Sequence, residues 1–198
     1  MLSGKKNRLG WIFDLLVNPI KRTGVNANQL TVLSLFFALL YLYLIYTRNY
    51  PLALFSIIIA ITLDALDGHL ARATRTASKY GAYLDTIVDR YVEFIILFSL
   101  LLVNLPTIIL PAEMWISLSI FGSLMTTYAK AAYSEKTGKG LSGGLLERAE
   151  RVVILIIAVG LLNLDKTYSL YILILLAALT NLSAIDRIIR ALILCTRN

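Results

Sequence analysis

The sequence has little charge and almost none of the two residue types that most often bind zinc. Only 16% of its 198 residues are charged, and it contains one cysteine, Cys195, and one histidine, His69. A single cysteine excludes a disulfide within the chain, and it excludes metal sites built from several thiolates. Any metal site in this chain is therefore expected to consist mainly of oxygen ligands.

The sequence is instead rich in apolar residues, which make up 58% of it and give a mean hydropathy of +0.75. These values are well above those of a soluble globular domain, so they predict an integral membrane protein. The net charge of +7 is not accompanied by a stripe of basic and aromatic residues, and we expect no nucleic-acid partner. Membrane lipids with anionic headgroups or phosphorylated substrates fit the positive charge better.

Apolar windows long enough to cross a bilayer follow one another along the chain. A hydrocarbon core of roughly 30 Å requires about 20 apolar residues in a helix. The sequence therefore predicts an all-α integral membrane fold, with residues 1–198 as a single domain. Its six expected transmembrane helices span about residues 28–47, 51–73, 81–104, 109–134, 145–163 and 167–194.

The N-terminal segment predicts a further helix that lies in the membrane interface. Trp11, Ile12, Leu15 and Leu16 share one face of an amphipathic helix expected over about residues 5–18. Lysine and arginine concentrate in this segment, in the links "RATRTASK" and "SEKTGKG", and near the C-terminus. The positive-inside rule therefore predicts a multi-pass protein of the cell membrane, with both termini and these links on the cytoplasmic side.

Four aspartates flank the first of these links, "RATRTASK". Asp64 and Asp67 are three residues apart, and Asp85 and Asp89 are four apart, so each pair occupies one face of its helix. Two such faces form a cage of hard oxygen ligands that suits Mg²⁺ or Mn²⁺, and two ions would balance the four charges. The alternatives are ion pairs that stabilise the fold and a divalent-cation transporter with the aspartates in its pathway.

The full pattern around these aspartates resembles the signature of the CDP-alcohol phosphotransferase family. It reads Asp64-x₂-Asp67-Gly68-x₂-Ala71-Arg72-x₈-Gly81-x₃-Asp85-x₃-Asp89. The resemblance implies a six-helix membrane enzyme, generally a homodimer. Such an enzyme transfers a phosphatidyl-type group from a CDP-lipid to a hydroxyl acceptor and releases CMP.

The resemblance also implies a role for each position of the pattern. It assigns metal binding to Asp64, Asp67 and Asp85, and it makes Asp89 the general base and a partial metal ligand. The residues that it places around the CDP-lipid are Asp64, Asp67, Gly68, Ala71, Arg72 and Gly81. The segment "VNANQLT" adds Asn28 and Thr31 as candidates, although Ala27 stands where the family usually has proline, and Asn28 is equally compatible with a helix cap.

Three other segments resemble the phosphatidylinositol-phosphate synthase branch, in which a basic pocket receives inositol phosphate. They are "YAKAAYSEKTGKG", "LLERAERVVILI" and "NLSAIDRII". The cations that would bind the phosphate of a phosphorylated polyol, inositol 1-phosphate above all, are Lys130, Arg148, Arg151 and Arg187. The branch often has Lys-Ala-Arg where this chain has an alanine as the third residue, so glycerol 3-phosphate remains an alternative acceptor.

Two further alternatives concern charged residues near this pocket. Arg148 and Arg151 also fit a solvated helix start, paired with Glu147 and Glu150. Glu93 fits either a partner for a nearby cation, such as Lys130 or Arg90, or a contact of the acceptor. The lipid tails of the donor, diacylglycerol or archaeol, are not distinguished by the sequence.

Overall fold

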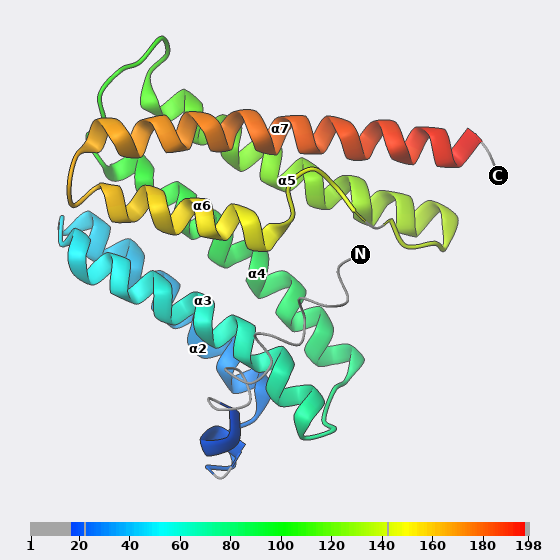
Figure 1. Ribbon diagram of the computed structural model, residues 1–198. Coiled ribbons are helices and arrows are strands. Elements are labelled where there is room, and N and C mark those ends of the chain that lie inside the picture. The colour runs from blue at the N-terminus through cyan, green and yellow to red at the C-terminus, as the bar shows by residue number, and fades with distance from the viewer. Residues whose placement is uncertain (1–16, 22, 142, 197–198) are drawn as a thin grey trace.

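The computed structural model describes residues 17–21, 23–141 and 143–196, and within these ranges every regular element is a helix (Figure 1). The helices are α2 (Ala27–Tyr46), α3 (Tyr50–Ala73), α4 (Lys79–Ser99), the short 3₁₀ helix η1 (Leu100–Leu102), α5 (Ala112–Thr137), α6 (Arg148–Leu161) and α7 (Lys166–Thr196). The interfacial helix predicted over residues 5–18 lies almost entirely outside the described residues.

Each of the six apolar windows coincides with a helix, and most ends agree within three residues. Local signals explain where several helices begin and end. Pro51 lies in the first turn of α3, behind Asn49, whose side chain accepts a hydrogen bond from the Leu52 amide. Ser78 caps α4 in the same way by accepting from the Gly81 amide, and α5 ends at Gly138, whose φ of 66° is left-handed.

Three of the described helices, α2, α3 and α7, are long and apolar enough to cross a membrane. Helix α6 has only 14 residues, and α4 contains five charged residues, among them Asp85, Asp89 and Glu93. Large apolar side chains also cover the outer surface, where Phe36, Phe55 and others are more than half exposed. An apolar exterior of this extent is expected of a membrane protein.

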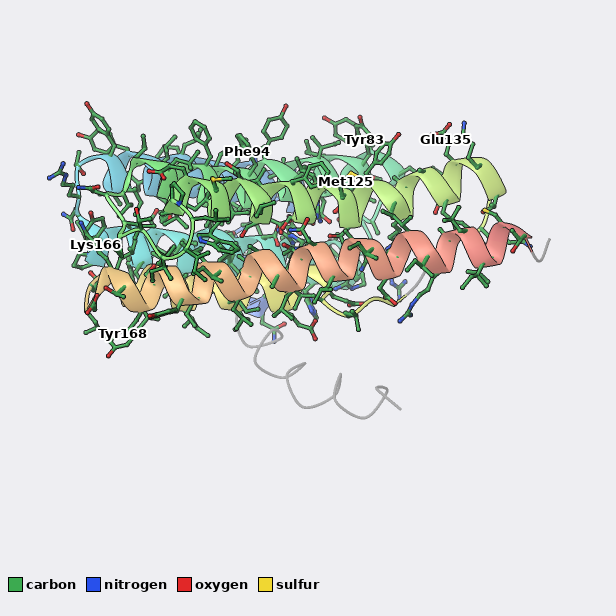
Figure 2. All side chains as sticks on the ribbon, turned by 90° about the horizontal axis from the view of Figure 1, so that it is seen from above. Tyr83, Phe94, Met125, Glu135, Lys166 and Tyr168 are labelled. Atoms are coloured by element: carbon green, nitrogen blue, oxygen red, sulfur yellow. The ribbon has the colours of Figure 1, made fainter. Side chains whose placement is uncertain are left out.

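Successive helices run in alternating directions, so the connections gather at two ends of the bundle (Figure 1). One end holds the turns between α2 and α3, α4 and α5, and α6 and α7. The other holds the 74–78 link, the α5–α6 link and the C-terminal end of α7. In Figure 2, Lys166 and Tyr168 lie at the first end, while Glu135 lies at the opposite end.

The helices form two closely packed groups that α6 joins. Helix α2 packs against α3 and α4, α5 packs against α7, and α6 contacts both α3 and α7. The shared core contains the fully buried Tyr41, Ile57, Leu155 and Leu173. Because α6 lies between the groups, the residues at its N-terminal end can reach the aspartates of α3 and α4.

The α5–α7 contact depends on a glycine. A Cβ atom on Gly122 would lie 2.6 Å from Thr180 Oγ1 and 2.8 Å from the Asn181 backbone nitrogen, so only glycine fits there without a shift. The Asn181 side-chain amide donates across the same contact to the Leu118 carbonyl at 2.9 Å. Small residues that let two backbones approach, together with hydrogen bonds between helices, are the usual means of packing membrane helices.

We expect Gly122→Ala to destabilise the protein by about 1–3 kcal/mol, since the new methyl group overpacks the α5–α7 contact. The measurement is thermal unfolding of the purified protein in detergent. Gly140→Ala is the matched control, because a Cβ at Gly140 would meet no atom within 4 Å. Equal unfolding temperatures for the two variants would show that α5 and α7 are less tightly packed than described.

Candidate active site

Three of the four motif aspartates bring their carboxylates together. Oxygens of Asp64 on α3 and of Asp85 and Asp89 on α4 all lie within 4.8 Å of one another, and we call these residues the aspartate triad. Asp67 lies outside this group. It is 3% exposed, and it accepts a hydrogen bond of 2.5 Å from Thr31 Oγ1 on α2.

The triad has the donor set of a site for an oxygen-preferring divalent cation. Carboxylates are the hard ligands that Mg²⁺ and Mn²⁺ prefer, and the three oxygens are close enough to share one ion. Three negative charges this close together repel one another unless a cation compensates them. The family resemblance assigned metal binding to all four aspartates, with Asp89 as a partial ligand. The structure groups Asp89 with Asp64 and Asp85 and leaves Asp67 outside.

Arg148, the first residue of α6, pairs with two members of the triad. Its Nη1 donates to Asp64 Oδ2 at 2.8 Å and its Nη2 to Asp64 Oδ1 at 3.3 Å, which is a bidentate contact. The same Nη2 lies 2.8 Å from Asp89 Oδ1. One guanidinium therefore bridges a carboxylate of α3 and a carboxylate of α4.

A second, more deeply buried pair lies next to this bridge. Arg151 and Glu93 are 2% and 3% exposed, and Arg151 donates to both Glu93 oxygens, from Nε at 2.6 Å and from Nη2 at 3.1 Å. Glu93 also accepts from Arg90 Nη1 at 3.1 Å, and that nitrogen donates to Thr127 as well. The structure thus decides the open question about Glu93 in favour of a partner for cations.

Arg148 and Arg151 do not pair with their neighbours on α6. Glu150 instead accepts a hydrogen bond from the Glu147 amide at 2.9 Å and so caps the start of the helix. The reading of these arginines as a solvated helix start paired with Glu147 and Glu150 is therefore wrong. Three residues apart on one helical face, they point together toward α3 and α4.

The motif residues line a cavity of about 350 Å³, which lies between the first turns of α2 and α4 and the last turns of α3. Of the residues predicted to surround the CDP-lipid, the lining of this motif cavity includes Asn28, Thr31, Asp67, Gly68, Ala71, Arg72 and Gly81, and it also includes Asp85. Asp64, which was predicted with them, is not part of the lining and belongs to the triad.

Asn28 contributes to the motif cavity and does not cap α2. The N-cap is Asn26, whose amide donates to the Gln29 side chain at 2.9 Å. A Cβ on Gly81 would lie only 3.0 Å from Asn28 Oδ1, so the glycine of the motif allows α2 and α4 to approach at this wall. The capping alternative for Asn28 is therefore wrong.

All four predicted phosphate-binding cations line a second cavity of about 550 Å³. We call it the cationic cavity, and its lining includes Asp89, Lys130, Arg148, Arg151 and Arg187. Lys130 is exposed, and within the described part of the chain it forms no ion pair.

Arg187 is held at the wall of the cationic cavity by backbone groups. Its Nη1 donates to the Thr126 carbonyl at 3.0 Å, and a Cβ on Gly144 would lie 2.7 Å from its Nε. The link before α6 therefore passes directly over the guanidinium because residue 144 is a glycine. Leu146 in the same link donates from its amide to Ser183 Oγ on α7 at 3.3 Å, which ties the link to α7.

We expect Glu93→Gln to destabilise the protein by about 3–5 kcal/mol, because it leaves the buried Arg151 charge without a counter-charge. The measurement is thermal or denaturant-induced unfolding in detergent. Glu135→Gln is the control, since Glu135 pairs with Lys136 on the surface, where both side chains are more than 70% exposed. Such an exposed pair contributes at most about 1 kcal/mol. A Glu93 variant as stable as the control would mean that the buried pair is not needed for folding.

Comparison with known proteins gives one family and several named relatives. A sequence model described as CDP-alcohol phosphatidyltransferase matches residues 25–189. An archaetidylinositol phosphate synthase of Pyrococcus horikoshii is 35% identical over 161 residues, which cover 80% of this chain and 81% of the relative. A phosphatidylinositol phosphate synthase of Corynebacterium glutamicum is 27% identical over 167 residues, which cover 79% and 74% of the two chains.

Solved structures with the same fold come from Mycobacterium tuberculosis. Its phosphatidylinositol phosphate synthase with bound CDP-DAG superposes with a TM-score of 0.77 at 21% identity, covering 91% of this chain and 93% of that one. The same enzyme in complex with manganese and citrate gives a TM-score of 0.79 at 21% identity, with 90% and 88% covered. At this level of identity the likeness establishes the shared fold.

Proposed function

This chain belongs to the CDP-alcohol phosphatidyltransferase family, and we propose that it transfers the phosphatidyl-type group of a CDP-lipid to inositol 1-phosphate and releases CMP. The sequence relatives that act as inositol-phosphate synthases support this acceptor. Both cavities meet at the aspartate triad, and this observation carries the proposal. Asp85 lines the motif cavity and Asp89 the cationic cavity, yet their carboxylates lie within 4.8 Å.

The motif cavity would receive the CDP part of the donor. Its glycines leave room along the backbone, and its volume of about 350 Å³ is within the range of small-ligand sites. Arg72 can present its planar guanidinium to a phosphate oxygen. Asn28 and Thr31 on α2 offer polar groups that would orient the nucleotide, and Thr31 also fixes Asp67 in the cavity wall.

The cationic cavity would receive the acceptor. Lys130, Arg148, Arg151 and Arg187 give it a positive lining that suits a phosphate dianion. Arg151 is already paired with Glu93, so Lys130 and Arg187 have more of their charge available for a ligand. A polyol phosphate bound there would place a free hydroxyl near Asp89.

Divalent cations, Mg²⁺ or Mn²⁺, would be held by Asp64, Asp67, Asp85 and Asp89. Two ions would balance the four negative charges. When bound, the cations supply positive charge to the pyrophosphate of the donor. Asp89 would accept the proton of the attacking hydroxyl while the acceptor oxygen bonds to the phosphorus that carries the lipid. The bond between that phosphorus and the leaving CMP oxygen breaks, and the donor pyrophosphate is thereby cleaved.

The membrane arrangement that suits this reaction has six transmembrane helices in one domain. The two cavities, the 74–78 link and the α5–α6 link would face the cytoplasm together with both termini, because the positively charged connections lie at that end. Soluble inositol phosphate could then reach the site while the lipid tails stay in the membrane.

A homodimer is the assembly that the family resemblance implies. The divalent-cation transporter is not retained, since family membership accounts for the aspartate pattern.

The test is an acceptor panel with purified protein, a CDP-lipid and Mg²⁺. We expect release of CMP only when an acceptor is present, and fastest with inositol 1-phosphate. Free inositol, serine and glycerol 3-phosphate complete the panel. A preference for glycerol 3-phosphate would replace the acceptor assignment but keep the family reaction, whereas CMP release that is independent of any acceptor would contradict transfer itself.

We predict that Asp89→Asn lowers kcat by at least about 10², the scale of a lost general base, because an amide cannot accept the hydroxyl proton. Binding of the CDP-lipid should change little. The measurement is steady-state CMP release with equilibrium binding of the donor. Asp165→Asn removes a carboxylate from the α6–α7 turn at the opposite end and should leave kcat unchanged. Near-normal turnover in Asp89→Asn would remove this residue from the role of base.

We predict that Lys130→Gln raises the KM for inositol 1-phosphate about tenfold, equivalent to about 1.4 kcal/mol of lost charge-assisted binding. The KM for the CDP-lipid should stay within about twofold, since Lys130 lines only the cationic cavity. Lys136→Gln is the control, because Lys136 lies on the same helix but pairs with Glu135 on the surface. A rise confined to the CDP-lipid constant would assign Lys130 to the donor.

A further inference from the structure

Arg148 stands at the boundary between the metal-binding candidates and the cationic cavity. It begins α6, and its guanidinium contacts Asp64 at 2.8 and 3.3 Å and Asp89 at 2.8 Å. The three side chains are only 24%, 9% and 13% exposed, so water screens these contacts weakly. Both carboxylates belong to the aspartate triad, and Arg148 also lines the cationic cavity.

Arg148 and a divalent cation need the same two carboxylates, those of Asp64 and Asp89. A cation held by the triad would sit about 2.0–2.6 Å from Asp64 and Asp89 oxygens, the range of Mg²⁺ and Ca²⁺ contacts. The guanidinium nitrogens lie 2.8 Å from those two carboxylates. Two cations so close in a partly buried site repel each other strongly. Binding of a divalent cation to the triad must therefore loosen the Arg148 bridge.

The cationic cavity offers Arg148 a second position. Arg148 lines the cavity of about 550 Å³ together with Lys130 and Arg187, so this open space lies next to its side chain. Its Nε has no hydrogen-bond partner among the described residues, so the bridged position leaves one donor unsatisfied. A phosphate in the cavity can accept from that donor and from the freed Nη atoms.

We propose that Arg148 is a positioning residue that exchanges between the triad and the acceptor phosphate. It neutralises Asp64 and Asp89 until a divalent cation takes these carboxylates, and it then adds its charge to the cationic cavity. Once Arg148 has left, the Asp89 oxygen that does not bind the cation can accept a hydroxyl proton. This inference rests on the proposed function, and it makes loading of the metal and binding of the acceptor favour each other.

The first test measures Mn²⁺ binding to the full chain, stripped of divalent cations by chelation, by calorimetry and by the electron spin resonance of free Mn²⁺. No substrate is present, so the result does not depend on the reaction. We expect Arg148→Gln to bind Mn²⁺ about tenfold more tightly than the wild type, because the competing guanidinium is gone. Arg190→Gln is the matched control, since Arg190 also pairs with an aspartate, but with Asp186 of its own helix α7 and not with the triad.

Equal or weaker Mn²⁺ binding by Arg148→Gln would overturn the proposal, as would a wild-type protein that binds no Mn²⁺. If the glutamine variant does not fold, Arg148→Lys replaces it. A single ammonium cannot bridge both aspartates as a guanidinium does, so this variant should also bind Mn²⁺ more tightly than the wild type.

The second test measures the coupling between the two sites with methyl phosphate, a phosphate monoester without a polyol. Saturating methyl phosphate should tighten Mn²⁺ binding about fivefold or more in the wild type and much less in Arg148→Gln. Equal coupling in both proteins would contradict the exchange. Failure of the proposed function would give a different result. CMP release would then not respond to inositol 1-phosphate, while the Mn²⁺ binding results would be unaffected.

Discussion

The structure depends on neutralising carboxylates inside an apolar helix bundle. Asp64, Asp89 and Glu93 are mostly buried, and unpaired charges in such surroundings would oppose folding. Their principal counter-charges, Arg148 and Arg151, come from α6, far away in the sequence. Pairing across this distance requires α6 to begin at the level of the carboxylates and to lie between the two helix groups.

The short length of α6 follows from this requirement. It begins at Arg148, where the hydrogen bond between Glu147 and Glu150 fixes its first turn, and it has only 14 residues. The link before it is held against α7 by the Leu146 contact, and its glycine lets it pass over Arg187. Since α6 does not extend to the end of the bundle, space for a cavity remains between the ends of its neighbours.

The two cavities on either side of the triad suit different substrates. The motif cavity has few fixed charges beyond its aspartates and Arg72, and its glycines suit close contact with a nucleotide. The cationic cavity is lined by five positive side chains, Arg90 among them, and suits a second, anionic substrate. Arg148 touches the triad from the cationic side, so a change in the charge at the triad is transmitted directly to the place where the acceptor would bind.

The sequence alone determined the helices and the grouping of the aspartates on helix faces, and the family resemblance named most, though not all, of the charged residues that line the two cavities. Long apolar windows require helices in a membrane, and aspartates three or four residues apart must share a helical face, so both inferences follow from local geometry. The tertiary structure decided which partners these side chains have. Asp67 pairs with Thr31 and lies outside the triad. Arg151 pairs with Glu93, and α5 meets α7 at Gly122. Such contacts depend on how each helix is rotated and shifted against its neighbours, which packing across the whole bundle sets and spacing along one helix does not.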